Sequence, residues 1–391
     1  MDAPMDQKVA NPYYTYGILY LSENFKRWEA SQGPAYRDYR RAWVDRPAAQ
    51  DPGKFPLNLN VEVTTRCNLA CTFCTQPTLT KEQLGDMPWD LFARVIEEGQ
   101  RYQTPAANLN GLGEPTLVRN LSRMIAHAKQ HGFLDVMFHT NGTLLNESIG
   151  RSLIESGLDR IIFSVDAPDK KTYEAMRIRA RWEEVVERVR RFWELRHRMG
   201  SSAPLIRTTM VMTDKTVHQV PDLVNLWKPI ADQITLQDLT WRSKLLDRGV
   251  WQNQEGSAIP TNLDEVREEA IRKKISFVCP YLYQSADVYW NGDVIPCCNP
   301  NARKHMVMGT LKEQSLQEVW LGQKYDEIRT LHATGRWHEH PICRTCEVPL
   351  IELYKKMNAE KEEPSSVASE MAPKDGSGSD LVIRYHKEST R

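Results

Sequence analysis

The sequence lacks three features, each of which would place it in a well-defined class of protein. No run approaches the roughly 18 to 20 consecutive apolar residues of a membrane span, and the first residues, MDAPMDQKVANPYY, contain neither the basic nor the apolar segment of a secretion signal. Neither sign of charge is in excess, since Lys+Arg and Asp+Glu both number 51, so no overall field attracts nucleic acid or an anionic membrane. We expect a cytoplasmic protein with a small or neutral partner, and with neither nucleic acid nor a membrane as partner.

Cysteine is also scarce, with eight residues in 391, and its distribution is uneven. In the reducing cytoplasm, cysteines more often bind metals or take part in redox chemistry than form disulfides. An early group and a late group are separated by about half of the chain: Cys67, Cys71 and Cys74 in one, and Cys279, Cys297, Cys298, Cys343 and Cys346 in the other. This grouping supports a metal-binding or redox role.

The length and the pattern of apolar residues indicate the fold. At roughly 150 residues per domain, the chain suggests two domains with additional segments. Residues 57–240 alternate between strand-like and helix-like segments, beginning with LNLNVEVTT and PWDLFARVIEEGQRY. About six such β/α repeats predict an α/β fold in which helices wrap parallel strands, as an open or partial barrel over residues 56–245. Functional loops lie at the C-terminal ends of such strands, and RCNLACTFC, which holds the early cysteines, follows the first strand.

The segments that flank this region have different textures. Residues 1–55 form a polar, aromatic-rich lead-in with a helix-like stretch, expected to pack on the outside of the main domain. Residues 270–355 are expected to form a second, cysteine-bearing domain with a β-hairpin, because Asn291-Gly292 separates two strand-like runs. Residues 358–391 are polar and rich in Ser, Pro and Gly, which predicts a disordered tail.

The early cysteines are spaced as ligands of one metal centre. Thiolates at positions 67, 71 and 74 in one loop can converge on one face of an iron-sulfur cube and leave its fourth iron without a protein ligand. Zinc is the alternative, but a structural zinc site needs four protein ligands and no fourth is adjacent. The spacing therefore favours a cluster with one iron open to a cofactor.

The spacing Cys67-x3-Cys71-x2-Cys74, with Asn68 after the first cysteine and Phe73 before the last, resembles the signature of radical S-adenosylmethionine (SAM) enzymes. The resemblance implies a partial (β/α)6 barrel, a [4Fe-4S] cluster on the three cysteines, and SAM beside it with Phe73 in the cofactor site. In that family the reduced cluster passes one electron to SAM, and the resulting 5′-deoxyadenosyl radical abstracts a substrate hydrogen. An external one-electron reductant such as flavodoxin or ferredoxin is implied as a partner.

A second element follows the second predicted strand. Residues 111–115 read GLGEP and resemble the family's GGEP element, with Leu112 in place of its first glycine. Gly113 would let the backbone approach a ligand, because glycine has no Cβ. The carboxylate of Glu114 suits the ammonium group of SAM, and Pro115 completes the element.

Two further strand ends carry residues where the family contacts SAM. Asn141 lies in HTNG after the third predicted strand, and Ser164 and Asp166 lie in SVD after the fourth. The resemblance assigns these residues to the ribose and carboxylate of SAM. Arg177 in YEAMR is a further candidate cofactor ligand, and its alternative is an exposed helical arginine.

The spacing of the late cysteines leaves two kinds of site open. Four of them could hold either zinc or a second [4Fe-4S] cluster. The segment CPYLYQSADVYWNGDVIPCC and the later ICRTC resemble the SPASM/twitch extension of radical SAM enzymes. The full form carries seven cysteines and two auxiliary clusters, whereas only five late cysteines are present here. The resemblance therefore implies the single-cluster form, with these ligands: Cys279, Cys297, Cys343 and Cys346.

Cys298 is the one late cysteine that is not an implied cluster ligand, and its position bears on whether the reaction is an epimerisation or a dehydrogenation. If its thiol faces the substrate, it could return a hydrogen atom to the substrate radical, which gives epimerisation. If it does not, it is a small buried residue behind the hairpin. An auxiliary cluster could instead accept the electron that leaves in a dehydrogenation, or it could be a structural staple.

The resemblance implies an oxidoreductase of natural-product biosynthesis that acts on a small polar alcohol. Single-cluster relatives dehydrogenate or epimerise sugar- or aminocyclitol-like substrates. Enzymes that mature ribosomal peptides are the alternative, but they often carry an extra peptide-binding domain for which 55 residues are few. A non-enzymatic iron-sulfur electron carrier would need none of the GLGEP, TNG and SVD elements, and a zinc-stapled binding module would be colourless.

Overall fold

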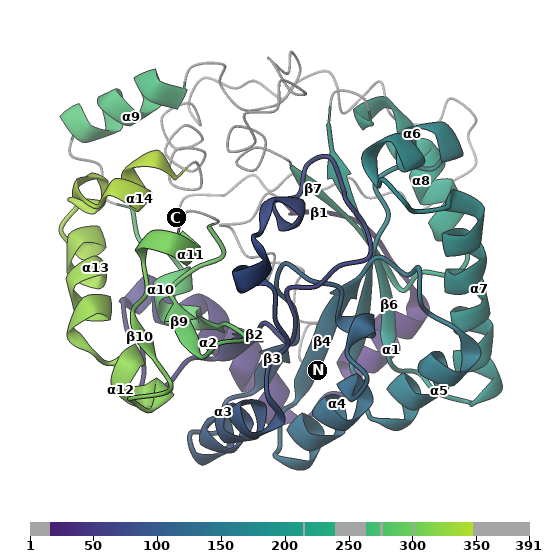
Figure 1. Cartoon of the computed structure of the whole chain (residues 1–391), viewed down its shortest axis with the longest axis horizontal. Helices are drawn as coiled ribbons and strands as arrows, with labels where there is room; N and C mark the ends of the chain where they lie inside the picture. The colour runs from purple at the N-terminus through teal and green to yellow at the C-terminus, as the bar shows by residue number, and fades with distance from the viewer. Residues whose placement is uncertain (1–15, 214–215, 239–262, 274–276, 300–301, 347–391) are drawn as a thin grey trace, which may run out of the picture.

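The described chain is organised around one sheet of ten strands in the order β1-β7-β6-β5-β4-β3-β2-β8-β9-β10 (Figure 1). The computed structural model describes residues 16–213, 216–238, 263–273, 277–299 and 302–346. The expected tail at 358–391 and the last expected residues of the barrel, 239–245, lie outside the described residues. The strands are β1 (Tyr16–Leu21), β2 (Asn58–Val61), β3 (Ala106–Asn108), β4 (Asp135–Thr140), β5 (Arg160–Ser164), β6 (Leu205–Met212), β7 (Gln233–Asp238), β8 (Ser285–Val288), β9 (Asp293–Ile295) and β10 (Gly309–Thr310).

The central strands β2 to β7 lie side by side in sequence order and run parallel. Helices that cover the outside connect them: α3 (Trp89–Arg101), α4 (Leu121–Gln130), α5 (Glu147–Glu155), α6 (Lys170–Met176), α7 (Trp182–Arg198) and α8 (Val220–Trp227). The arrangement is a partial barrel, so the fold class predicted from the alternating pattern is confirmed.

Helix α3 shows why these segments are helical. Its apolar side chains recur at helical spacing, and both Phe92 and Ile96 are fully buried. Gly99 lies on the same buried side, where a Cβ would come within 2.7 Å of the Phe133 ring. A glycine at this position therefore lets α3 pack closely against the rest of the barrel.

The strands have two faces of different chemistry. On β2, Leu59 and Val61 are fully buried, and Leu59 packs toward Gly99 of α3. The intervening residue, Asn60, points to the opposite side, because successive residues of a strand face opposite ways. Its amide donates a hydrogen bond to Asp287 of β8 at 2.6 Å. The inside of the barrel is therefore polar at this position, while the outside is apolar.

The N-terminal segment forms more structure than the sequence indicated. Strand β1 pairs antiparallel with β7, which was not expected. The helix-like stretch forms two helices, α1 (Glu23–Ala30) and α2 (Pro34–Ala49), which separate where Gly33 and Pro34 interrupt the pattern. Aromatic side chains of both helices pack against residues near the starts of the barrel strands: Phe25, Trp28, Tyr36 and Tyr39 against Leu57, Ala106 and Leu205. The segment therefore covers the N-terminal end of the barrel.

The C-terminal part of the described chain extends the same sheet (left in Figure 1). Strand β8 pairs parallel with β2, and β9 and β10 follow in antiparallel pairs. The predicted Asn-Gly hairpin joins β8 and β9, with Gly292 at a φ of +92°. The accompanying helices are α9 (Leu263–Arg272), α10 (Tyr281–Gln284), α11 (Ala302–His305), α12 (Leu316–Trp320), α13 (Gln323–Ala333) and α14 (Pro341–Thr345). None of the described helices combines the length and the apolar character needed to cross a membrane.

Candidate functional site

The early cysteines lie in the loop that leaves the C-terminal end of β2. The C-terminal end of α6 and the residues after it hold this loop, because the amides of Ala70 and Thr72 donate to the carbonyls of Ile178 and Met176 at 3.1 and 2.9 Å. Within the loop, the amide of Cys74 donates to the Cys71 carbonyl at 3.2 Å. The three cysteines are thus fixed at a strand end, where functional loops of such barrels lie.

The thiols of this loop are close enough to affect one another's ionisation. Burial raises the pKa of Cys71 to about 12, and the neighbouring thiols Cys74 and Cys67 add to this effect. Burial also raises the pKa of Cys67. All eight cysteines are among the described residues, none of them forms a disulfide, and no three of their sulfur atoms lie within 4.8 Å of one another.

Glu114 is the centre of a buried hydrogen-bond network between β3 and β4. Its carboxylate accepts hydrogen bonds from the Thr140 hydroxyl at 2.7 Å, from the Asn141 amide at 2.7 Å and from the Thr116 hydroxyl at 2.6 Å. Burial raises the pKa of Glu114, and these hydrogen bonds lower it without fully offsetting that effect. Glu114 therefore joins two strand ends and keeps a fixed orientation.

Asn141 connects this network to the cysteine loop. Its side-chain amide donates to the Asn68 oxygen at 2.9 Å and lies 4.0 Å from the Cys67 sulfur. Its own oxygen accepts from both the amide and the hydroxyl of Thr143, at 2.9 and 2.6 Å. The structure therefore places Asn141 at the early cysteines, and its contact with SAM stays a prediction. The supporting role of Thr143 was not foreseen.

Asp166 and Arg177 form a buried ion pair beside the same loop. The Arg177 Nε lies 2.6 Å from the Asp166 carboxylate, and the side chains are 8% and 0% exposed. Another guanidinium nitrogen lies 3.9 Å from the Cys71 sulfur, and the group sits 5.6 Å from the centre of the Phe73 ring. Burial alone would lower the pKa of Arg177, but Asp166 and Cys71 raise it above its ordinary value. Arg177 is thus buried at the cysteine loop and is not an exposed helical arginine.

The two glycines of the GLGEP element lie so close to other residues that no larger side chain would fit. A Cβ on Gly113 would lie 2.4 Å from the Thr64 carbonyl oxygen and 2.7 Å from that of Arg66. A Cβ on Gly111 would collide with the Glu62 side chain at 2.3 Å. The element therefore lies directly against the backbone that leads into the cysteine loop.

The remaining predicted cofactor residues lie at neighbouring strand ends. Ser164 is the last residue of β5 and is half-buried. Pro115 is buried and begins the short 3-10 helix η3 (Pro115–Leu117) after β3. The ends of β3, β4 and β5 thus converge on one side of the cysteine loop.

The late cysteines come from three separate parts of the small domain. Cys279 precedes α10, Cys297 follows β9, and the other two lie in or directly after α14: Cys343 and Cys346. Burial raises the pKa of Cys279 well above its ordinary value, with further increases from Cys346 and Cys343. The fold therefore brings together thiols that the sequence separates widely.

Cys298 differs from its neighbour in the sequence. Its side chain is exposed, and its sulfur lies 3.1 Å from the Tyr281 hydroxyl. It raises the pKa values of Cys297 and Cys279, so it is close to the late group. The expectation of a small buried residue does not hold, and Cys298 is accessible beside that group.

A pair of carboxylates inside the barrel was missed at the sequence level. Glu62 pairs with both guanidinium nitrogens of Arg303 at 2.7 and 2.6 Å, which links the end of β2 to α11. Asp287 of β8 is 7% exposed, and burial raises its pKa to about 7. The alternation of LNLNVEVTT could have indicated an inward Glu62, but its partner lies 241 residues away in the sequence.

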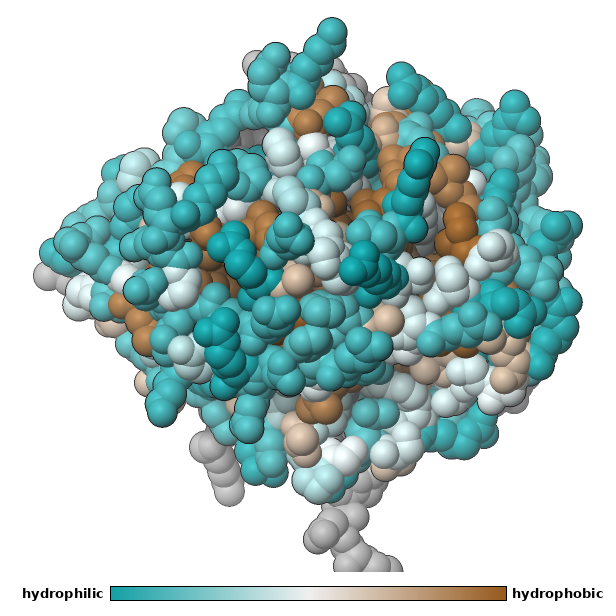
Figure 2. Space-filling model, turned by 60° about the horizontal axis from the view of Figure 1, so that its bottom comes forward, coloured by the Kyte–Doolittle hydropathy of each residue, from teal (hydrophilic) through white to brown (hydrophobic). Residues whose placement is uncertain are grey.

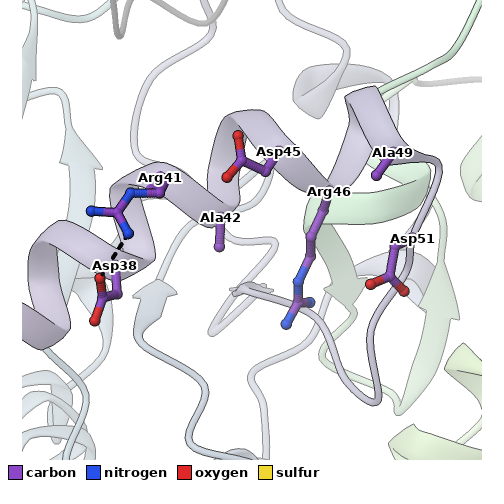
Figure 3. A pocket seen from close by; sticks show the side chains of 7 residues that line it. All are labelled: Asp38, Arg41, Ala42, Asp45, Arg46, Ala49 and Asp51. Atoms are coloured by element: carbon purple, nitrogen blue, oxygen red, sulfur yellow. Dashed lines mark ion pairs between the residues drawn. The ribbon is translucent and has the colours of Figure 1, made fainter.

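A shallow hollow of about 330 Å³ lies far from these strand ends, along the outer side of α2 (Figure 3). Charged side chains line it, and Asp38 and Arg41 pair across one turn of the helix at 3.4 Å. Arg46 donates to the carbonyls of Pro52 and Phe55, at 3.2 and 2.7 Å, and thereby fastens the segment after α2. The hollow is thus a structural feature of the covering helix.

Comparisons with known proteins agree with this arrangement. The family model of the radical SAM superfamily matches residues 61–226, and that of an iron-sulfur cluster-binding domain, SPASM, matches residues 279–347. The tungsten-containing aldehyde ferredoxin oxidoreductase cofactor-modifying protein of Pyrococcus furiosus is 23% identical over 314 residues, which are 74% of this chain and 87% of that protein. A probable GTP 3′,8-cyclase of Methanopyrus kandleri is 31% identical over 176 residues, 44% of this chain and only 53% of that protein.

Solved structures share the fold. SuiB of Streptococcus suis, bound to its precursor peptide SuiA, aligns with a TM-score of 0.58 and 16% identity over 82% of this chain and 76% of that chain. The two matched domains and this shared fold agree with the strand-end motifs. The chain therefore belongs to the radical SAM superfamily. It is an enzyme whose cofactors are SAM and [4Fe-4S] clusters, and its C-terminal SPASM domain holds an auxiliary cluster.

Proposed function

We propose that this enzyme abstracts a hydrogen atom from a small polar substrate, a sugar- or aminocyclitol-like alcohol, and thereby dehydrogenates or epimerises it. When bound, the reduced cluster and SAM supply the 5′-deoxyadenosyl radical for that abstraction. The chain's own residues bind and orient both partners. The polar inner face of the barrel is the observation that carries the choice of a polar substrate.

The early loop fits a cluster better than it fits zinc. Sulfur ligands of one tetrahedral zinc ion lie ~3.8 Å apart, because Zn–S bonds are about 2.3 Å long. No three sulfur atoms of the described cysteines approach within 4.8 Å of one another. Such spacing suits thiolates on separate irons of a cube. We assign Cys67, Cys71 and Cys74 to the SAM cluster on this basis.

The assigned SAM contacts follow from charge and position. The Glu114 carboxylate, at the strand end beside the early loop, would take the ammonium group of SAM as a charge-assisted hydrogen-bond acceptor. Arg177 lies near both Cys71 and Phe73, and while its Nε pairs with Asp166, another guanidinium nitrogen faces the early loop, where it would reach a carboxylate. The other proposed contacts lie at the same strand ends: Gly113, Pro115, Asn141, Ser164 and Asp166.

The inner face of the barrel is mostly polar. Residues in register across the central strands share one side of the sheet, and most are half-exposed: Asn60, Asn108, His139, Ser164, Arg207 and Gln237. Met137, Ile162 and Val211 are among the apolar residues on this face. Several of these side chains already bond within the barrel, as Asn60 does to Asp287 and Arg207 to Thr235, so an apolar substrate would displace water from a polar surface without replacing its hydrogen bonds, and such desolvation is costly. A substrate with several hydroxyl or amino groups would pair with them.

Of the residues on the inner face of the barrel, Asp287 is the best suited to exchange a proton with the substrate. It accepts a hydrogen bond from Asn60 at 2.6 Å, and no described cation lies within ion-pair distance of it. A carboxyl group with a pKa of about 7 can accept or return a proton near neutral pH. We propose that it binds a substrate hydroxyl or ammonium group.

We assign the auxiliary cluster to Cys279, Cys297, Cys343 and Cys346. The mutual effect of these thiols on their pKa values supports the grouping. Cys298 is accessible beside them, so we retain it as the candidate hydrogen-atom donor of an epimerase. Its replacement in Cys298→Ala should convert net epimerisation into oxidation if that role is correct, and should leave a dehydrogenase unaffected.

The test begins with anaerobic reconstitution of the full chain. About eight irons per chain are expected for two [4Fe-4S] clusters, with slow formation of 5′-deoxyadenosine from SAM after reduction. Deuterated polyols and aminocyclitols would then be screened for deuterium in 5′-deoxyadenosine. Cleavage of SAM without transfer from any of these alcohols, but with transfer from another class, would refute the proposed substrate.

A second candidate substrate class comes from the curated relatives. One relative is described as modifying an enzyme cofactor and others as probable GTP 3′,8-cyclases. The screen should therefore include GTP and the cofactor of a tungsten-containing aldehyde ferredoxin oxidoreductase, with ribosomal peptides as a third arm. Deuterium transfer from one arm alone identifies the class.

A further inference from the structure

We propose that this enzyme binds a divalent transition-metal ion, such as Zn²⁺ or Ni²⁺, at a second kind of site on the outside of the barrel. The ligands are Glu97 of α3, His127 of α4 and His131, which directly follows α4. One ligand atom from each of these side chains lies within 4.8 Å of the other two. The helices α3 and α4 lie next to each other at the lower edge of Figure 1, and the site would bridge them.

The two imidazoles are placed by the helix itself. Residues four apart lie on the same face of a helix, so His127 and His131 are neighbours. Their ring centres are 4.1 Å apart. The His127 ring also packs edge-on against Trp89, with ring centres 5.2 Å apart, which limits its rotation. The first two ligands are therefore ordered before any ion binds.

Each of the two rings has a nitrogen atom that is available to a metal. His131 Nδ1 lies 2.8 Å from the His127 carbonyl oxygen, so it carries the proton and donates it. Nε2 of His131 then presents its lone pair, which is the arrangement found in most metal-binding histidines. In His127, Nε2 is buried and has no hydrogen-bond partner among the described residues. A buried imidazole nitrogen without a hydrogen-bond partner is consistent with a ligand supplied from outside.

The donor set decides which metal fits. Two imidazole nitrogens and one carboxylate suit Zn²⁺, Ni²⁺, Co²⁺ or Fe²⁺, whereas Mg²⁺ and Ca²⁺ prefer oxygen ligands alone. Glu97 is exposed and the histidines are half-buried, so water can complete the coordination. The surface seen in Figure 2 is largely hydrophilic, with only small hydrophobic spots. The bound ion would stabilise the folded chain by linking α3 to α4.

The site uses none of the cysteines, which allows a selective test. The enzyme would be loaded with both clusters under anaerobic conditions and titrated with Zn²⁺ by calorimetry. We expect the wild type to bind one Zn²⁺ that Glu97→Gln binds at least tenfold more weakly and that His131→Gln does not bind. Zinc X-ray absorption should show only nitrogen and oxygen neighbours at about 2.0 to 2.2 Å, without sulfur at about 2.3 Å.

His197 provides a matched control on α7. Its Nδ1 lies 2.8 Å from the Trp193 carbonyl oxygen, and its ring lies tilted against that of Trp193 with ring centres 4.2 Å apart, as the ring of His131 does against that of His127. Among the described residues it belongs to no group of three metal-binding side chains. His197→Gln should therefore bind Zn²⁺ as the wild type does.

Three outcomes would overturn the proposal. They are the absence of this binding event in the wild type, equal binding by wild type and His131→Gln, and sulfur neighbours around the bound zinc. Glu97 is exposed, so Glu97→Gln should fold normally even if His131→Gln perturbs the end of α4. Formation of 5′-deoxyadenosine should be the same in the wild type and in Glu97→Gln, because the site lies on the outer helices.

Discussion

The two groups of cysteines are built in opposite ways. The early group lies within eight residues of one loop and is surrounded by buried polar contacts, from Glu114, Asn141 and the Asp166–Arg177 pair. The late group is assembled from three distant segments that meet only when the hairpin and α14 are in place. A site made by local sequence can be recognised before folding, whereas a site made by topology needs the whole domain.

Substitution of a cysteine in the early loop should have the largest effect on iron content and on the cleavage of SAM. Cys71→Ser should lower the iron content from about eight to about four per chain and abolish formation of 5′-deoxyadenosine, because the SAM cluster loses one of its three ligands. Iron analysis and chromatography of the reaction products measure both quantities. Retained cleavage of SAM in this variant would remove Cys71 from the proposed site.

The late group should respond differently. Cys297→Ser should also lower the iron content to about four, but cleavage of SAM should persist at a similar rate while substrate turnover is lost. The comparison of this variant with Cys71→Ser separates the two sites. If Cys297→Ser abolished cleavage of SAM as well, the two groups would not be independent.

The stability of the contact between the barrel and the C-terminal domain should depend on the Glu62–Arg303 ion pair. Glu62→Gln leaves the Arg303 guanidinium without its anionic partner. Both side chains are largely buried, with Glu62 1% and Arg303 13% exposed. Removal of one partner of a buried pair costs about 3 to 5 kcal/mol of the free energy of unfolding. Urea unfolding of the loaded enzyme measures this loss, and Glu62→Gln combined with Arg303→Met should recover part of it.

The most gradual effect concerns the dependence of stability on pH. Burial raises the pKa of Asp287 to about 7, so the folded state holds this proton where the unfolded state, with a pKa near 4, has lost it. Stability should therefore fall as the pH rises from about 4 to 7, by up to ~4 kcal/mol. Asp287→Asn should remove this fall, and the variant should be more stable than the wild type at pH 8. An identical pH profile for both proteins would refute the assignment.

Much of this could be predicted from the sequence where the signal is local. The β/α alternation gave the barrel, and the spacing of RCNLACTFC together with GLGEP gave the centre of the candidate site. The structure adds contacts between residues far apart in the sequence, such as Asn141 with Asn68 and Glu62 with Arg303. No local pattern encodes such partners. Strand β1 was missed because its role depends on the free edge of β7, which lies more than 200 residues later.

The pairing of β8 with β2 has a consequence for the way in which the chain can be divided. Strand β2 leads into the loop of the early cysteines and uses one edge for β3 and the other for β8. A barrel expressed without residues 277–346 would therefore expose β2 as a bare edge, and bare edges template aggregation. The radical-generating half and its cysteine-rich extension are accordingly one folding unit, although two family models divide them.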